Sequence, residues 1–475
     1  MRELIVDSFA GGGGASEGIR RATGRSPDIA INHDPNAISM HMINHPETRH
    51  YQEDIWQVDP REATGGQPIG LAWWSPDCTH FSVARGGVPV DKGIRGLAWV
   101  AVRWAATVRP RVNILENVKE FLTWGPLLPN SRPDPARKGE TFRSFIRQLE
   151  RLGYTVEWRV LRACDYGAPT SRERLFVQFR NDGRPIVWPD PTHGHPDSPA
   201  VRAGRLKPWR TAAECIDWSL PVPSIFDRKK PLAENTLRRI ARGLRKFVIE
   251  NPNPFIVSGG AAFMAKHFGG NYTGAGSGMD DPIGTITTKD HNALVVAFLQ
   301  QYYTAEAARG QTLDQPIMTI PTENRYGLVT AHICKFRGTN VGQPADAPLQ
   351  TISAGGNHHA LVQAFLITYY GSSVGQALDE PINTIVTKDR FGLVYVHGTP
   401  YQIIDIGMRM LQPHELYAGQ GFGPEYIFTH GHDGRRFSKS VQVDKCGNSV
   451  CPDLVEAVVR AACPELCGVE RTIAG

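Results

Sequence analysis

The sequence contains no run of about 18 consecutive apolar residues, and no two of its cysteines are separated by only two residues. The first absence excludes a membrane-spanning helix. The second, with eight cysteines in 475 residues, argues against a disulfide framework and against a structural zinc site. We therefore expect no metal, and we expect most of the cysteines to be small buried residues.

A signal peptide and a strong charge of one sign are also missing. The N-terminal LIVDSFAGGGG is typical of a strand followed by a glycine-rich turn, and it contains no cleavage site. A cytoplasmic protein is therefore expected. The net charge of +5 is a mild basic excess, which is compatible with a polyanionic partner without requiring one.

The patterning of the chain changes twice, which predicts more than one domain. Residues 1–185 alternate between strands and helices, and this alternation predicts an α/β fold, a doubly wound sheet with helices on both faces. Residues 186–400 are rich in proline, glycine and short strands, which predicts a second, β-rich domain. Residues 401–475 return to helical patterning and are expected to rejoin the first domain.

An internal repeat, D-x-P-x-x-T-I, marks the second domain, with a pitch of roughly 33 residues. Each copy is followed by an apolar Leu-Val pair. The repeat either shapes a duplicated β-hairpin or contacts nucleic acid directly, because repetition shows architecture and not contact. The copies span Asp280–Ile286, Asp314–Ile320, Asp346–Ile352 and Asp379–Ile385.

One helix is expected within this domain, in the segment ENTLRRIARGLRKFVIE. Asn235 is a candidate N-terminal cap for it. Its basic face carries Arg238, Arg239, Arg242, Arg245 and Lys246.

The segment FAGGGG, Phe9–Gly14, lies between an expected strand and an expected helix. Glycines there allow a ligand to approach the backbone at the carboxyl end of the sheet. The segment lacks the Walker lysine, which disfavours a phosphate-cradling ATPase. Asp54 follows a later strand, where its carboxylate either hydrogen-bonds an adenine or ribose or serves as a helix cap or surface group.

Cys78 lies in SPDCTHFS, on a turn directly after a short apolar strand, where a thiolate can act as a nucleophile. Glu116, in LENV, ends the next expected central strand. Because parallel neighbours end at the same rim of a sheet, the thiol and the carboxyl group should face each other. This pair fits attack on an electron-poor ring, with sulfur adding to carbon and the acid holding and protonating a ring nitrogen.

Arg172 and Arg174 alternate in GAPTSRERLF, so their guanidinium groups should project to one side, suited to a carbonyl oxygen or phosphate. The alternative is a pair of salt-bridged surface arginines. GNSV, Gly447–Val450, is a short polar turn before the final expected helix and means little by itself.

Together and in this order, the five segments resemble the DNA cytosine-5 methyltransferase family. FAGGGG resembles its cofactor loop, SPDCTHFS its Pro-Cys segment, LENV its Glu-Asn-Val segment, TSRER its Gln-x-Arg-x-Arg segment and GNSV its Gly-Asn-x-Val turn. The resemblance covers residues 1 to about 182 and about 408 to 462. SPDCTHFS followed by ARGG is similar to the same region of phage or prophage members.

This resemblance implies that a cytosine is swung out of duplex DNA, that Cys78 adds to its C6, and that Glu116 contacts the ring nitrogen and amino group. Arg174, with Arg172, would hold the ring carbonyl. It also implies S-adenosyl-L-methionine as cofactor, a Rossmann-like methyltransferase sheet and a target recognition domain around the repeats. The cofactor contacts it implies are Phe9, Ala10, Gly11, Gly14, Asn32, Asp34, Asp54, Ile55, Pro76, Asn448 and Val450.

Four residues depart from the family pattern: Asp77 stands where proline is usual, and Thr79 and Thr170 stand where glutamine is usual. The acid expected on the ribose aligns with Asn32, although Asp34 is close. Two alternatives therefore stay open, a tRNA cytosine-5 methyltransferase and an inactive DNA-binding relative. A monomer in a bacterial or phage-infected cell, with or without a restriction endonuclease as partner, is expected.

Overall fold

The structure is a computed structural model. It describes residues 2–77, 96–130, 132–226, 228–251, 255–257, 260–266, 276–289, 292–300, 331–335, 350–356, 359–366, 393–396 and 399–467. The chain divides into two compact units. The first unit comprises Met1–Ala168, Arg172–Pro208 and Gln420–Gly475, and the second comprises Pro169–Ser171 and Trp209–Gly419. The boundaries between the two units lie at residues 208 and 419, whereas the composition suggested 185 and 400. The functions assigned to the domains stay a prediction.

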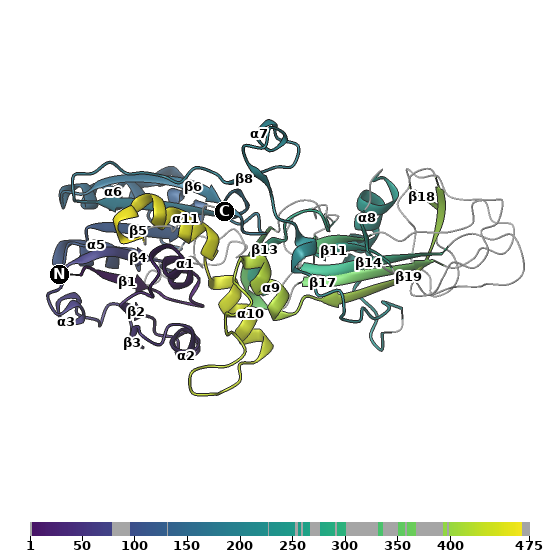
Figure 1. Cartoon of the computed structure of the whole chain (residues 1–475), viewed down its shortest axis with the longest axis horizontal. Helices are drawn as coiled ribbons and strands as arrows, with labels where there is room; N and C mark the ends of the chain where they lie inside the picture. The colour runs from purple at the N-terminus through teal and green to yellow at the C-terminus, as the bar shows by residue number, and fades with distance from the viewer. Residues whose placement is uncertain are drawn as a thin grey trace, which may run out of the picture. The chain divides into compact units, whose positions relative to one another are not determined.

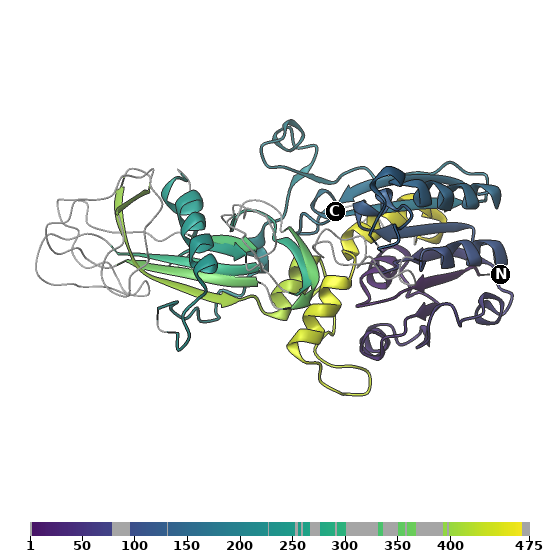
Figure 2. The same cartoon turned by 180° about the vertical axis from the view of Figure 1, so that it is seen from behind.

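The first unit is built on a seven-stranded sheet with the strand order β3-β2-β1-β4-β5-β7-β6 (Figures 1 and 2). The first five strands in this order run parallel, and β7 runs antiparallel to both of its neighbours. Their bounds are β1 Leu4–Ser8, β2 Ile29–Ile31, β3 Arg49–Tyr51, β4 Ile69–Trp74, β5 Val112–Asn117, β6 Thr155–Arg162 and β7 Glu173–Arg180.

Helices cover both faces of this sheet, because its central strands are apolar on both sides. Every residue of β4 and β5 is buried. Trp74 packs in one apolar cluster with the helices α5 and α6, whereas Trp73 packs in the other with α1 and α11. The predicted doubly wound fold is confirmed. The helices of this unit are α1 Gly14–Thr23, α2 Pro35–Asn44, α3 Pro60–Thr64, α5 Trp99–Thr107, α6 Glu140–Arg151, α7 Pro199–Arg202, α10 Lys439–Asn448 and α11 Pro452–Ala462. A short pair of strands, β8 His193–Gly194 and β9 Lys207–Pro208, lies outside the main sheet.

The C-terminal helix α11 lies beside the N-terminal helix α1 (Figure 1). Gly18 makes this contact possible, because a Cβ atom there would lie 2.4 Å from the Cβ of Val455. The segment after residue 420 is therefore an integral part of the first unit, and the expectation that the chain returns to this sheet agrees with the packing.

The second unit is rich in β-structure, as predicted. Its main sheet has eight strands with the path β10-β11-β12-β15-β14-β19-β17, and β18 pairs with β19. A separate parallel pair joins β13 and β16. The strands are β10 Ile256–Val257, β11 Gly260–Lys266, β12 Ser277–Gly278, β13 Gly284–Lys289, β14 Asn292–Gln300, β15 Ala331–Lys335, β16 Gln350–Gly356, β17 His359–Leu366, β18 Leu393–Val396 and β19 Thr399–Met410.

The first and third repeat copies occupy equivalent places in this unit. Ile286 of the first copy pairs with Ile352 of the third in the β13–β16 ladder. The strands that follow flank β19 in the same register, since Ala293 and Ala360 both pair with Met410. These copies therefore have an architectural role. The second and fourth copies lie outside the described residues.

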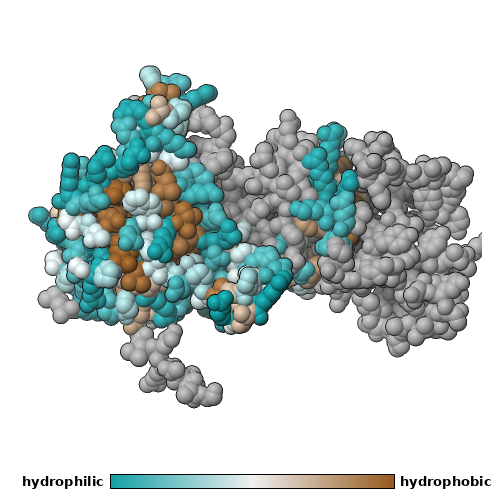
Figure 3. Space-filling view, turned by 90° about the horizontal axis from the view of Figure 1, so that it is seen from above, coloured by the Kyte–Doolittle hydropathy of each residue, from teal (hydrophilic) through white to brown (hydrophobic). Residues whose placement is uncertain are grey.

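The basic helix α8, Glu234–Leu244, packs against β11 and β15 and continues into one π-helical turn, Arg245–Ile249. Its side chains form a teal, hydrophilic column in Figure 3. The predicted cap is wrong: Ala233 is the N-cap, and Asn235 lies inside the first turn. The remaining helix, α9, spans Pro413–Gln420. Among the described residues, no helix has both the length and the apolar character that crossing a bilayer requires.

Candidate active site

The carboxyl ends of the five parallel strands meet at one rim of the sheet. Phe9 follows β1, Asn32 follows β2, Asp54 comes after β3, Pro76 follows β4, and Glu116 lies near the end of β5. This is the edge at which doubly wound folds bind ligands. The structure therefore brings together, on one edge, residues that are up to 107 positions apart in the sequence.

Glu116 forms an ion pair with Arg174, with 3.0 Å between Oε1 of the carboxylate and Nε of the guanidinium group. The two side chains are only 10% and 11% exposed. The contact follows from strand direction, because β7 runs antiparallel to β5 and so begins beside its carboxyl end. A carboxylate held this way has a fixed orientation and can present its second oxygen to a substrate.

Asn117 fixes the segment that leads to Cys78. Its amide nitrogen donates to the carbonyl of Pro76 at 3.1 Å, and its side-chain oxygen accepts from the backbone of Val118 at 2.9 Å. Ser75 is held in turn by a backbone bond to the carbonyl of Ser8. Cys78 and Thr79 themselves lie outside the described residues. The role of Asn117 was missed from the sequence, although LENV contains it.

Arg172 is buried, and its guanidinium donates to the carbonyl of Gly447 at 3.2 Å. Gly447 belongs to the GNSV turn at the end of α10. Arg172 therefore ties two of the predicted motifs together inside the first unit. Arg172 thus binds a backbone carbonyl whereas Arg174 binds the Glu116 carboxylate, and a role of Arg172 on a ring carbonyl stays a prediction.

The glycine-rich loop has one position that is open to a ligand. A Cβ atom on Gly11 would have no neighbour closer than 3.8 Å, whereas one on Gly12 would lie 2.4 Å from the carbonyl oxygen of Lys445. Gly14 would meet the carbonyl of Val450 at 2.1 Å. The later glycines thus serve close packing within the protein, and Gly11 leaves backbone accessible. Phe9 has φ of 66°, a left-handed conformation that side chains rarely adopt and that is common at functional sites.

Asn32 and Asp34 are both near the end of β2 but have different surroundings. Asp34 caps α2 by accepting from the backbone of Asn36 at 2.8 Å, and it pairs with the ammonium group of Lys445. Burial, the largest single effect, would raise the pKa of Asp34, but the hydrogen bond and charge of Lys445 and the backbone N–H groups of Asn36 and Ala37 together outweigh it, so the pKa is lowered. Asn32 accepts from the backbone N–H of Asp34 at 2.8 Å, which leaves its amide nitrogen to donate.

The remaining predicted contacts form polar and apolar parts of the same rim. Asp54 is exposed and accepts from the backbone of Trp56 at 3.0 Å. Asn448 is exposed as well. The apolar side chains, which are buried, are Ala10, Ile55 and Val450. An open glycine backbone after β1, with hydrogen-bonding side chains after the neighbouring strands β2 and β3, fits a nucleoside-bearing cofactor.

A buried hydrogen-bonded chain lies under this rim and was not foreseen from the sequence. Ser16 donates to the carboxylate of Asp7 at 2.6 Å, His41 Nε2 lies 2.8 Å from the Ser16 hydroxyl, and His41 Nδ1 lies 2.8 Å from His50 Nε2. Burial raises the pKa of Asp7 to about 7 and lowers that of His50 to about 4. Since α1 begins at Gly13 with no side-chain cap, Asp7 and Ser16 anchor the first turn of α1 against β1.

We expect Asp7→Asn to make folding stability less sensitive to alkaline pH. The pKa of Asp7 lies above its value of 3.8 in an unfolded chain, so its stabilising contribution is present at low pH and is lost as the pH rises through about 7. Asparagine can keep the bond from Ser16 without a charge. The stability of the variant relative to wild type should therefore increase by about 2–3 kcal/mol between pH 5 and pH 8.

Urea unfolding at the two pH values measures this difference. The histidines titrate alike in both proteins and cancel. Asp197→Asn, which changes an exposed carboxylate, is the control and should show no such increase. An unchanged difference at pH 5 and pH 8 would mean that Asp7 stays ionised in the fold.

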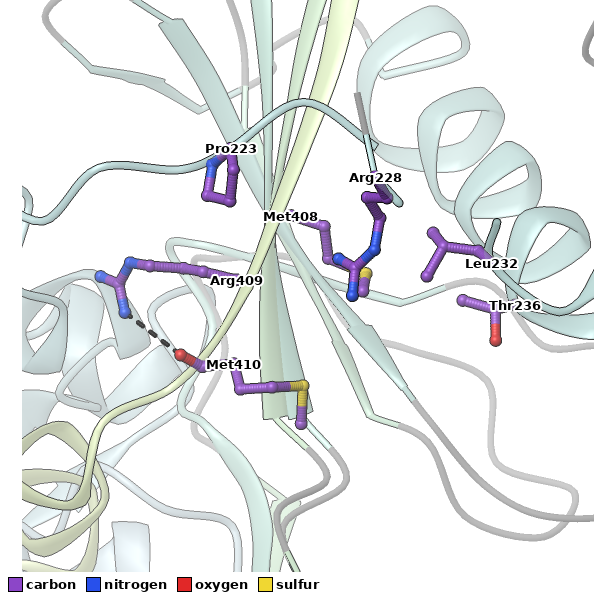
Figure 4. A pocket seen from close by; sticks show the side chains of 7 residues that line it. All are labelled: Pro223, Arg228, Leu232, Thr236, Met408, Arg409 and Met410. Atoms are coloured by element: carbon purple, nitrogen blue, oxygen red, sulfur yellow. Dashed lines mark hydrogen bonds between the residues drawn. The ribbon is translucent and has the colours of Figure 1, made fainter. Parts of the chain in front are cut away.

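The other cysteines offer no second nucleophile among the described residues. Burial raises the pKa of the thiols of Cys164, Cys446 and Cys463, and raises that of Cys451 to about 12. In the described ranges no group of three His, Cys, Asp or Glu side chains is arranged to hold a metal ion. A hollow of about 440 Å³ in the second unit is lined by Pro223, Arg228, Leu232, Thr236, Met408, Arg409 and Met410 (Figure 4), a set without a nucleophile or an acid.

Residues 4–207 match the sequence pattern of the family described as C-5 cytosine-specific DNA methylase. The match shows a C-5 cytosine-specific DNA methylase domain over this part of the chain. The match includes four of the five segments on which the resemblance was based, and it contains Cys78, Glu116, Arg172 and Arg174. The predicted family and enzyme class, DNA cytosine-5 methyltransferase, are confirmed.

Individual type II methyltransferases match over less than half of the chain. The chain is 28% identical to the type II methyltransferase M.AquIA of Picosynechococcus over 235 residues, which are 46% of this chain and 88% of the relative. It is 30% identical to M.AgeI of Thalassovita gelatinovora, over 40% of this chain and 42% of the relative. M.NgoMIV of Neisseria gonorrhoeae is 32% identical, over 41% and 58%. The chain thus spans about half the length of the last two.

Proposed function

We propose that this protein methylates C5 of cytosine in double-stranded DNA, with Cys78 as covalent nucleophile and S-adenosyl-L-methionine as methyl donor. The observation that carries the proposal is the buried-edge ion pair of Glu116 and Arg174, on the rim where Asn117 fixes Pro76. Pro76 lies two positions before Cys78. A positioned carboxyl group beside a nucleophile-bearing turn is the arrangement that addition to a cytosine ring requires.

In the proposed mechanism, the Cys78 sulfur bonds to C6 of a cytosine that has been swung out of the duplex. Glu116 holds and protonates the ring nitrogen N3, which accepts the electron pair displaced by the sulfur. Arg174 orients Glu116 and would donate a hydrogen bond to the ring carbonyl. S-adenosyl-L-methionine, when bound, supplies the methyl group for C5. A base then removes the C5 proton, the Cys78 sulfur departs with the electron pair of the C6–S bond, and N3 returns its proton to Glu116, which restores the aromatic ring.

The residues that would hold the cofactor follow the rim from β1 to β3. Gly11 allows close approach of the backbone, and Phe9 lies in the strained turn beside it. The amide nitrogen of Asn32 would donate to a ribose hydroxyl in place of the usual acid, because Asp34 is already engaged by Lys445. Asp54 would accept from the adenine or ribose. The remaining proposed contacts are Ala10, Gly14, Ile55, Pro76, Asn448 and Val450.

The second unit is proposed as the target recognition domain, because it interrupts the first unit between residues 208 and 420. We propose a monomer acting on DNA in the cytoplasm of a bacterial or phage-infected cell. The type II relatives carry names of restriction–modification enzymes, which supports a restriction endonuclease as cellular partner.

Trapping on 5-fluorocytosine tests the proposal, since fluorine at C5 cannot leave as a proton does and the covalent complex persists. Wild type, supplied with the donor, should form a denaturant-resistant complex with duplex DNA that contains the analogue. A complex formed with tRNA alone would establish the tRNA alternative. Binding of DNA without any covalent complex would establish an inactive DNA-binding relative.

Asp77→Pro is expected to retain most of the methyl-transfer activity. The carboxylate of Asp77 stands directly before the thiol, where it would raise the pKa of Cys78 unless a cation offsets it. Our hypothesis is that an arginine, Arg85 or Arg172, holds Asp77 so that it shapes the turn as proline does in the family. Steady-state methyl incorporation measures the effect, and a complete loss of activity would contradict the hypothesis.

A further inference from the structure

The positive charge of the chain is concentrated in one short segment of the second unit. Residues 228–250 contain eight lysines and arginines against two glutamates, a net charge of +6, whereas the whole chain carries +5. The rest of the protein is therefore close to neutral. The mild basic excess of the composition is a local property of α8 and of the residues directly before it.

The fold presents these cations to solvent on one side of α8. The opposite side is buried through Ile240, Leu244, Phe247 and Val248, which are at most 6% exposed. The exposed cations are Arg228, Lys229, Lys230, Arg238, Arg242, Arg245 and Lys246. Arg238 and Arg242 are one helical turn apart, about 6 Å along the axis, and Arg245 and Lys246 extend the row by another turn.

The glutamates neutralise only two of these cations. Arg238 pairs with Glu234 and Arg245 with Glu250, both at 2.5 Å and with exposed side chains. Such exposed pairs contribute little stability and exchange readily for another anion. Among the residues that the structure describes, Lys229, Lys230 and Arg242 have no carboxylate partner. These three cations can therefore bind anions from outside the protein.

Arg228, the first cation of the row, lines the hollow shown in Figure 4 together with Met408, Leu232 and Thr236. A duplex carries about one phosphate per 3.4 Å of helix axis on each strand, so a row of about 12 Å can meet three or four of them. The helix α8 packs against β11 and β15, so one side of it is covered by protein and only the other side can face a duplex.

We infer that α8 and the Arg228–Lys230 segment bind the phosphate backbone of duplex DNA without reading its sequence. This inference rests on the proposed function, because it takes DNA as the substrate. The surface supplies affinity that falls steeply with salt and holds the second unit on the duplex. Selection of the methylated site then depends on other parts of the unit.

The experiment compares two double variants of equal charge change and equal spacing. Arg238→Gln with Arg242→Gln alters α8, and Arg143→Gln with Arg147→Gln alters the exposed face of α6 in the first unit. Binding to a duplex of random sequence is measured by fluorescence anisotropy from 50 to 300 mM KCl. The slope of log affinity against log salt should fall by about 2 for the α8 variant, since each phosphate contact contributes about 0.9. The α6 variant should match wild type.

Three outcomes would overturn the inference. The α8 variant could keep the wild-type slope, the α6 variant could lose as much as the α8 variant, or bisulfite sequencing could show that the α8 variant methylates a different site, which would make α8 a sequence reader. Thermal unfolding checks that the exposed substitutions leave the fold intact. If wild type binds tRNA and not duplex DNA, the proposed function fails. If wild type is still trapped on DNA but the α8 variant keeps the wild-type slope of log affinity against log salt, only the inference about α8 is rejected.

Discussion

Cys78→Ala is expected to abolish both the covalent complex with 5-fluorocytosine DNA and all detectable methyl transfer. Without the sulfur, no bond forms at C6, and C5 of cytosine is too weak a nucleophile to accept a methyl group. Binding of the same DNA should be almost unchanged, because the side chain lost is small. Gel electrophoresis under denaturing conditions measures the complex, and radiolabelled methyl incorporation measures turnover.

Cys467→Ala is the matched control for this experiment. Burial raises the pKa of the Cys467 thiol, and its sulfur donates to the backbone carbonyl of Cys463 at 3.4 Å. Its removal should leave trapping and turnover at the wild-type level. If the Cys78→Ala protein still formed the covalent complex, another residue would have to be the nucleophile, and the proposed mechanism would be refuted.

Glu116→Gln is expected to lower kcat for methyl transfer by about 100- to 10,000-fold, the usual contribution of a positioned general acid. Glutamine has nearly the same shape, and its side-chain oxygen can still accept from Arg174, so the rim should keep its geometry. What it cannot do is protonate the cytosine ring. Single-turnover kinetics with saturating DNA separates this chemical effect from any effect on binding.

Glu173→Gln provides a control on the neighbouring strand β7, next to Arg174. Glu173 also pairs with cations, namely Lys119 and Arg162, but both pairs are more exposed than that of Glu116. We expect the Glu173 variant to turn over within a few-fold of wild type. An equal loss in both variants would mean that negative charge on the paired strands β5 and β7, and not acid catalysis by Glu116, governs the rate.

The sheet and the place of Glu116 near its rim were accessible from the sequence because both follow from local pattern and strand direction, whereas the ion pair of Glu116 with Arg174 was not foreseen. IGLAWW and VNILEN are continuous apolar runs, which predict strands that are buried on both faces. Adjacent strands of a parallel sheet end at one rim, so a motif at the end of each run is expected there. The resemblance to a known family added the order of the motifs.

Other parts of the site depend on contacts that no local pattern shows. Asp34 is bound by Lys445, 411 positions later, and this contact decides that Asn32 is the group left facing the rim. The chain of Asp7, Ser16, His41 and His50 joins four elements whose spacing in the sequence resembles ordinary helix and strand patterning. Asn235 was misplaced for a simpler reason, since the helix begins one residue before it and Ala233 takes the cap position.

A hydrogen bond between the C-terminal part of the first unit and the glycine-rich loop can form only late in synthesis. The hydroxyl of Tyr426 donates to the carbonyl of Gly12 at 2.9 Å across 414 residues. At about 5–20 residues per second, the ribosome makes Tyr426 roughly 20–80 s after Gly12. During that interval the nascent chain carries the loop without its support. Polypeptides that are released early by a stop codon or a stalled ribosome therefore lack this hydrogen bond to the glycine-rich loop.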